Sequence, residues 1–144
     1  MTVLHTLVAI TALSLAASAA VHADGKKAAE PHAHGHWMAP MDEQKRPNPV
    51  KADHISLERG KKLFEENCVS CHGTGGRGDG PAGKALKPRP ADLVQMRSHH
   101  PDGDFAWKIA EGKAPMPGFK ATLNESQIWD LVNYVKRGLP AQKK

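Results

Sequence analysis

The clearest helical pattern of apolar residues lies in the stretch SLERGKKLFEENC. Its apolar and small positions recur at intervals of three and four residues, which places Leu57, Gly60, Phe64 and Cys68 on one helix face. Ser56 is a residue type that caps helix N-termini, so we expect the helix to begin there. A glycine inside a helix costs about 1 kcal/mol relative to alanine. Gly60 therefore predicts a close crossing by another helix, with an indifferent surface position as the alternative.

A second helical pattern, NESQIWDLVNYVKRGLP, lies near the C-terminus. Asn124 and Gln127 have the spacing of a capping box, so this helix should begin after Asn124. Gly138 suits a left-handed residue beyond the last turn, and Pro140 prevents continuation of the helix. The expected buried stripe comprises Ile128, Leu131, Val132 and Val135.

Between these two patterns the chain is mostly loop, rich in glycine and proline. A short helix is expected over GDFAWKIAEGK, and no stretch alternates β-branched with polar residues as a strand would. The pattern therefore predicts an all-α domain. Loops this long are uncommon in compact domains unless they have a function of their own, so we expect this one to wrap a cofactor.

The N-terminal residues have the pattern of an export signal. The run from Leu4 to Ala20 is nearly all apolar or small, and Val21 and Ala23 fit the −3 and −1 positions of a cleavage site. We predict a signal peptide over residues 1–23 and a periplasmic mature protein without a membrane span. The run is short beside the roughly 20 residues that a span needs. An uncleaved anchor is the alternative, since no Lys or Arg precedes the run.

Composition divides the rest of the chain into residues 24–53, an extended arm rich in His and Pro, and a domain over residues 54–144. The domain carries the net charge of +5, as 15 Lys and Arg against 10 Asp and Glu. The arm holds imidazole and thioether groups of a kind that suits copper. Packing on the domain through Trp37, docking of a partner and disorder are its other interpretations. The imidazole and thioether groups are those of His32, His34, His36, Met38 and Met41.

Both cysteines lie in the stretch ENCVSCHG. A disulfide between Cys68 and Cys71 would close a tiny loop and stabilise little. A structural zinc needs four ligands, and a thioredoxin-like pair needs a βαβ context. The pattern C-x-x-C-H is the attachment signature of c-type haem, in which two thiols add across the vinyl groups and the histidine, here His72, binds the iron.

From Ser56 to Gly138 the chain resembles class I cytochrome c. GKKLFEENCVSCHG is similar to the family's N-terminal helix and haem motif, MPGF to its distal-ligand loop, and DLVNYVKRG to its C-terminal helix. GRGDGPAGKALKPRPADL resembles the loop after the haem motif in many bacterial members. The resemblance implies an all-α cytochrome c fold, in which N- and C-terminal helices cross and loops wrap one covalently bound haem c.

The same resemblance implies roles for individual residues. Cys68 and Cys71 would form the thioethers, His72 would be the proximal iron ligand, and Met116 would be the distal one. The carbonyl of Pro81 would accept a hydrogen bond from His72, with Pro88 and Pro90 as alternatives. The other candidate distal ligands are Met96, Met38, Met41, His99 and His100, of which we expect Met96 to be buried and the two histidines to be solvated. Trp107 and Trp129 are expected in the core.

We therefore expect a one-electron carrier and not an enzyme, because no catalytic acid, base or nucleophile constellation is visible. Its partners would be redox proteins and not nucleic acid. The surplus of Lys and Arg would either attract acidic docking surfaces or serve solubility. A haem-based sensor of small ligands and an electron-transfer subunit of a larger respiratory or dehydrogenase complex are the alternative functions.

Overall fold

The computed structural model describes residues 37–141 of the chain. Apart from one isolated bridge between Lys113 and Met116, these residues form helices and loops and no strand, as the pattern predicts. The helices are α1 (Met41–Gln44), α2 (His54–Asn67), α3 (Val69–His72), a 3₁₀ turn η1 (Gly83–Ala85), α4 (Leu93–Met96), α5 (Asp102–Glu111), α6 (Glu125–Asn133) and a π-helical turn η2 (Tyr134–Gly138).

The structure corrects the expected start of α2. The helix begins at His54, and the side chain of Asp53 caps it by accepting the amide of Ser56 at 3.0 Å. Ser56 itself is buried, and its hydroxyl donates to the carboxylate of Asp130 at 2.6 Å. An aspartate three residues before the serine is an equally good cap, and the burial of Ser56 against α6 decides between the two.

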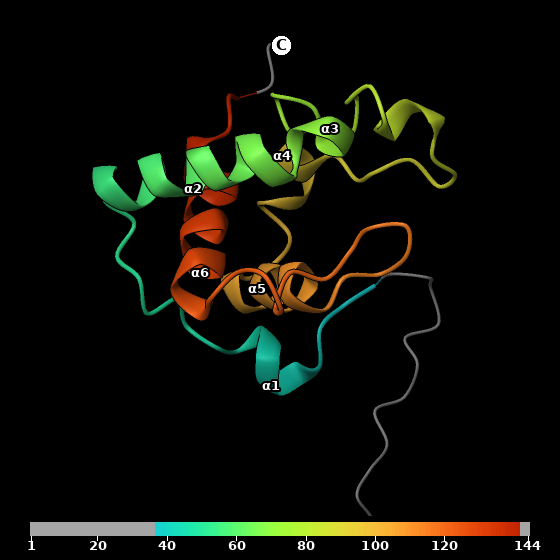
Figure 1. Ribbon diagram of the computed structural model, residues 1–144. Coiled ribbons are helices and arrows are strands. Elements are labelled where there is room, and N and C mark those ends of the chain that lie inside the picture. Colours follow the sequence, from blue (N-terminus) through green and yellow to red (C-terminus); the bar gives the residue numbers. More distant parts are fainter. Residues whose placement is uncertain (1–36, 142–144) are drawn as a thin grey trace, which may run out of the picture. The chain divides into compact units, whose positions relative to one another are not determined.

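Helices α2 and α6 cross, as the two residue patterns predict (Figure 1). A Cβ on Gly60 would collide with the carbonyl oxygen of Asp130 and lie 2.8 Å from Cβ of Tyr134, so the helices meet at this glycine. One turn further along α2, the rings of Phe64 and Tyr134 pack with centroids 5.5 Å apart. The predicted stripe of α6 is buried in this core, as are Phe64 and Trp129.

The crossing also buries a polar cluster. Asp130 is 2% exposed, and its carboxylate accepts hydrogen bonds from Ser56 and from the guanidinium of Arg59 at 2.6 and 2.8 Å. Asn133 donates to the Ser56 hydroxyl at 2.8 Å and to the carbonyl of Val50 at 3.0 Å. Because buried polar groups are costly unless they are paired, this cluster fixes how the two helices align.

The ends of α6 agree with the sequence in part. Asn124 and Gln127 form the predicted capping box. Gly138, by contrast, is not left-handed but ends the π-helical turn η2. A Cβ at Gly138 would collide with the ring of Tyr134, so the glycine makes room for a side chain and does not serve as a left-handed cap.

Residues 37–53 are packed along the helices, where the composition indicated an extended arm. Helix α1 lies against α5 in Figure 1, and Asn48 is hydrogen-bonded to Asn133 of α6 at 2.9 Å. The proposed signal peptide and the three arm histidines, His32, His34 and His36, lie outside the described residues. Over residues 37–141 no helix is long and apolar enough to cross a membrane.

Replacing Gly60 by alanine should lower the free energy of unfolding by about 1–3 kcal/mol, because the added methyl group forces α2 and α6 apart. Gly75→Ala is the matched control, since a Cβ there meets only the Arg77 side chain at 3.8 Å. Thermal or denaturant unfolding of the two variants measures the difference. Equal stabilities would show that the crossing does not depend on Gly60.

Candidate functional site

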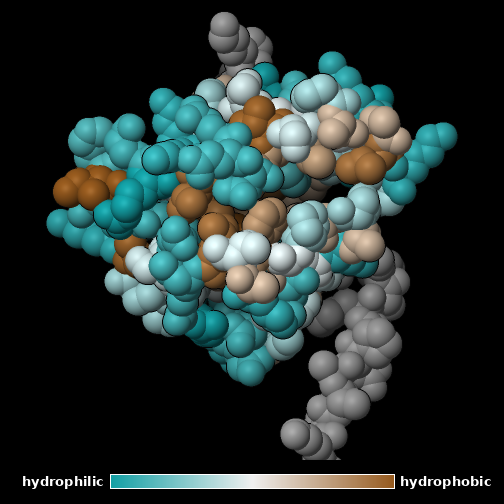
Figure 2. Space-filling view, viewed as in Figure 1, coloured by the Kyte–Doolittle hydropathy of each residue, from teal (hydrophilic) through white to brown (hydrophobic). Residues whose placement is uncertain are grey.

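A largely apolar cavity of about 320 Å³ lies between the C-terminal half of α2, the loop before α4 and the loop after α5. Figure 2 shows hydrophobic side chains in the hollow between the surface of α2 and the loop over residues 112–120. Its walls include Phe64, Leu131 and Val135, which belong to the α2–α6 core. The volume lies in the range typical of ligand and cofactor pockets.

The cysteine motif lies at one wall of this cavity. Cys68 follows the last residue of α2, and α3 then turns the chain so that Cys71 and His72 line the cavity with it. The amide of His72 donates to the carbonyl of Cys68 at 2.8 Å, which fixes this turn. Both cysteines are free. Burial raises the pKa of Cys68 to about 12, and the neighbouring Cys71 adds to the shift, so the group is a thiol at neutral pH.

His72 is held as a neutral ligand-type imidazole. Its Nδ1 lies 3.2 Å from the carbonyl oxygen of Ala91. Burial lowers the pKa of His72, and the hydrogen bond to Ala91, which acts in the opposite direction, is the smaller effect. A neutral ring that donates through Nδ1 keeps its lone pair on Nε2, which is the arrangement of metal-binding histidines in proteins.

The carbonyl beside His72 is thus that of Ala91 and not that of Pro81, which is exposed and does not line the cavity. The loop after the motif doubles back, because Gly78 donates to the His72 carbonyl at 2.9 Å and Leu93 donates to the Gly76 carbonyl at 2.7 Å. Gly78 has a φ of +72°, and a Cβ there would collide with the carbonyl of Pro90. This return brings the distant Ala91 to the histidine.

Met116 lines the cavity from the loop after α5. The turn that carries it is closed by two backbone hydrogen bonds, Lys113 to the Met116 carbonyl at 3.0 Å and Met116 to the Lys113 carbonyl at 2.9 Å. Met96 also lines the cavity and packs against the core, whereas Met38 and Met41 do not line it. The cavity therefore brings Cys68, Cys71, His72 and Met116 together, with Met96 as a second thioether.

His99 is exposed, as expected of a polar turn, but His100 is not. The His100 side chain is 10% exposed, and its Nδ1 lies 2.7 Å from the Asp104 carboxylate. Asp104 is fully buried and also pairs with Lys108 Nζ at 2.6 Å. The sequence contains the signal for this cluster, because the three residues follow one another at intervals of four.

Three cationic side chains line the cavity, those of Arg89, Lys108 and Lys113. Lys108 among them is buried and paired with Asp104. The loop that ends in Arg89 also carries Lys84 and Lys87, both exposed, and no acidic residue lies between Lys84 and Ala91. The rim of the cavity on this loop is therefore positive.

These walls suit a flat apolar cofactor that carries a metal. Among the described residues no group of three or more His, Cys, Asp and Glu could hold a free metal ion. One imidazole and one thioether could instead take the two axial positions of an iron held in a macrocycle. The thiols of Cys68 and Cys71 could anchor the macrocycle, and the aliphatic and aromatic walls could cover its faces.

Known proteins have sequences similar to this part of the chain. Residues 57–138 match the protein-family model described as Cytochrome c. Cytochrome c6 of Bumilleriopsis filiformis is 32% identical over 79 residues, which cover 55% of this chain and 87% of that protein. Cytochrome c6 of a Nostoc species is 40% identical over 76 residues, 53% of this chain and 65% of that protein.

Two larger proteins contain a similar segment. A nicotinate dehydrogenase subunit of Pseudomonas putida is 30% identical over 99 residues, which cover 62% of this chain and 8% of that protein. A chain in a solved structure of the reducing HAO-like protein complex of Kuenenia stuttgartiensis superposes with a TM-score of 0.56 at 28% identity. That match covers 65% of this chain and 47% of the other.

Proposed function

This chain belongs to the cytochrome c family, as a class I c-type cytochrome and haem electron carrier, and from that premise we propose that it carries one electron at a time on a single covalently attached haem c with His72 and Met116 as axial ligands. The observation that carries the proposal is the gathering of two free thiols, a neutral imidazole and a thioether around one apolar cavity. We propose no enzymatic activity for it.

Attachment uses the two cysteines. Each thiol would add across one vinyl group of the haem, with the sulfur on one carbon and the hydrogen on the other, so that the addition would need no oxidant or reductant. The haem, when bound, supplies an iron that alternates between its ferric and ferrous states.

His72 and Met116 would hold that iron and set its reduction potential. The Ala91 carbonyl orients the His72 ring and leaves Nε2 free to bind. The closed turn from Lys113 to Met116 presents the thioether from the opposite loop. A thioether raises the reduction potential relative to more electron-donating ligands, and two axial ligands leave no open position for a substrate.

The positive rim supports an acidic redox partner. Lys84, Lys87 and Arg89 extend from the loop beside the cavity without an acidic neighbour between them. Such a surface attracts an anionic partner from a distance and increases the encounter rate. Because the N-terminal residues 1–23 have the pattern of a signal peptide, we place the encounter in the periplasm.

A second candidate function is that of an electron-transfer subunit of a larger complex. The similarity to a segment of the nicotinate dehydrogenase subunit and to a chain of the Kuenenia stuttgartiensis complex favours it. Size-exclusion chromatography of the protein from its native cells distinguishes the two. A free carrier elutes as a monomer, whereas a subunit elutes with its dehydrogenase or reductase.

Replacing both Cys68 and Cys71 by alanine should leave no haem on the protein after extraction with acid and organic solvent, because both thioether bonds are lost. It should also leave the domain largely unfolded, since core residues line the cavity. Haem staining after denaturing electrophoresis measures the attachment. Haem that resists extraction from the double variant would refute the covalent assignment.

Met116→Ala should abolish the weak sulfur-to-iron absorption band of the oxidised protein, near the red end of the visible spectrum. It should also lower the reduction potential, because a thioether stabilises ferrous over ferric iron. Carbon monoxide should then bind the iron, because the position that the thioether would occupy is open. Visible spectroscopy, a redox titration and carbon monoxide binding measure the three effects.

Met96→Ala is the matched control, since Met96 lines the same cavity. It should keep the band and cost only packing, on the order of 2 kcal/mol of stability. If the band survives Met116→Ala and vanishes with Met96→Ala, the ligand is Met96. A wild-type protein that lacks the band and binds carbon monoxide at once would instead favour the haem-based sensor.

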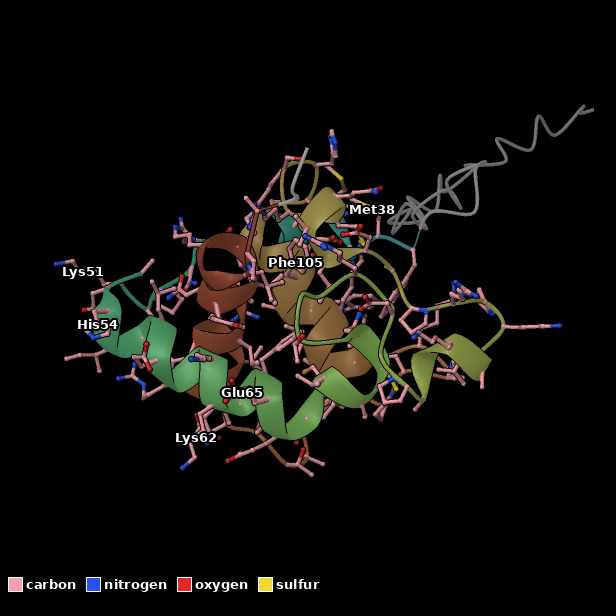
Figure 3. The ribbon with its side chains drawn as sticks, turned by 90° about the horizontal axis from the view of Figure 1, so that it is seen from above. Met38, Lys51, His54, Lys62, Glu65 and Phe105 are labelled. Carbon is pink, nitrogen blue, oxygen red and sulfur yellow. The ribbon has the colours of Figure 1, made fainter. Side chains whose placement is uncertain are left out.

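Lys87→Glu should slow oxidation of the ferrous protein by ferricyanide, an anionic reagent, and the effect should shrink as salt is added. Exposed charges are screened beyond about 8 Å at physiological ionic strength. Lys51→Glu changes the net charge equally but lies on the side of the molecule away from this loop (Figure 3). Equal rates for the two variants, measured by stopped flow at low salt, would assign the positive rim to solubility alone.

A further inference from the structure

One wall of the cavity comes from outside the part of the chain that matches the family model. Trp37 lines the cavity, although the match begins at residue 57. Its ring packs on Trp107 of α5, with centroids 6.1 Å apart and planes tilted by 59°. Trp107 itself does not line the cavity, so Trp37 is the aromatic group that this part of the wall presents to the interior.

The segment behind Trp37 is anchored by a buried charge. The amide of Ala39 donates to the Asp104 carboxylate at 2.7 Å, and Ala39 and Asp104 are 4% and 0% exposed. The same carboxylate is held by His100 and Lys108, so it has a fixed position. Gln44 also donates to the Ala39 carbonyl at 2.6 Å.

The other end of the segment is tied to α6. Asn48 is hydrogen-bonded to Asn133, and the Val50 carbonyl accepts from the Asn133 amide. Residues 37–50 therefore form a strap from α5 to α6. In Figure 3 the labels Met38 and Lys51 mark residues near the two ends of the strap, the second on the side that leads into α2.

Trp37 is also in contact with the turn that carries Met116. The ammonium groups of Lys108 and Lys113 lie 5.7 and 6.0 Å from the centre of its ring, within the range of cation–π attraction. Lys113 is the residue whose backbone closes the Met116 turn through two hydrogen bonds. A single ring thus joins α5 to the turn of the distal ligand.

We propose that Trp37 is a positioning residue for the thioether of Met116 and that the strap over residues 37–50 closes the cavity wall beside it. This inference rests on the proposed function, in which Met116 binds the iron. The ring restrains Lys113 and, through it, the Met116 turn, and its apolar area keeps water out of that side of the cavity. Without it the turn opens more often, and water reaches the site.

The test uses the full-length holoprotein with Trp37→Ala. Carbon monoxide should bind the ferrous form about 3–10-fold faster, the change expected from losing one or two cation–π contacts. Amide exchange of Met116, followed by NMR in the ferrous protein, should accelerate by a similar factor. The reduction potential should fall, because water near the iron favours the ferric state. Trp37→Phe, which keeps an aromatic face, should restore most of the wild-type behaviour.

Val132→Ala is the control for a general loss of stability. Val132 is fully buried in the core and does not line the cavity, so its replacement should lower the free energy of unfolding without changing carbon monoxide binding. Wild-type rates and potential in Trp37→Ala would overturn the inference, as would equal acceleration in Trp37→Ala and Val132→Ala. Failure of the underlying function is seen separately, because Met116→Ala would then keep the sulfur-to-iron band.

Discussion

The fold of this domain is built around one apolar cavity, which lies between α2, α6, the loop before α4 and the loop after α5. Phe64, Leu131 and Val135 belong to the hydrophobic core and also line this cavity, so the core has one face that protein atoms alone do not cover. A group that fills this face would stabilise the folded state, because it binds the folded chain and not the unfolded one. The haem implied by the family would fill it, so the site and the core share the same residues.

The helices and the haem motif could be predicted because their signals are local. The capping box at Asn124 and the stripe of α6 each depend on residues within a few positions of one another, and the structure contains both. The crossing at Gly60 joins distant helices, but its signal in the sequence, a glycine inside a helical pattern, is local. The thiols and His72 also lie within one turn of chain. Met116 is different, because its role came from resemblance to a family and not from spacing.

The parts that the sequence did not predict correctly depend on contacts between distant residues. Ala91 lies 19 positions from His72, and it reaches the ring only because the glycine-rich loop doubles back; Pro81 was the nearer proline in the sequence. The polar neighbours of His100 in the sequence predict a solvated side chain. In the structure His100 is instead partly buried, because it pairs with Asp104 one helical turn along the chain, and Asp104 also pairs with Lys108. Ser56 is a good cap in isolation, and its burial against Asp130 leaves that role to Asp53.

Under our proposal, the strap lets one family fold hold its distal ligand more or less firmly without a change in the ligand itself. The α2–α6 crossing is fixed by Gly60 and the Asp130 cluster, which do not contact Trp37. Trp37 instead lies against Lys113 and lines the cavity, and under our proposal it acts on the Met116 turn and on access of water. The potential of such an iron depends on solvent exposure and on the groups around its ligands as well as on the ligands. A segment ahead of the family domain can therefore tune the electron carrier while the packing that defines its fold stays as it is.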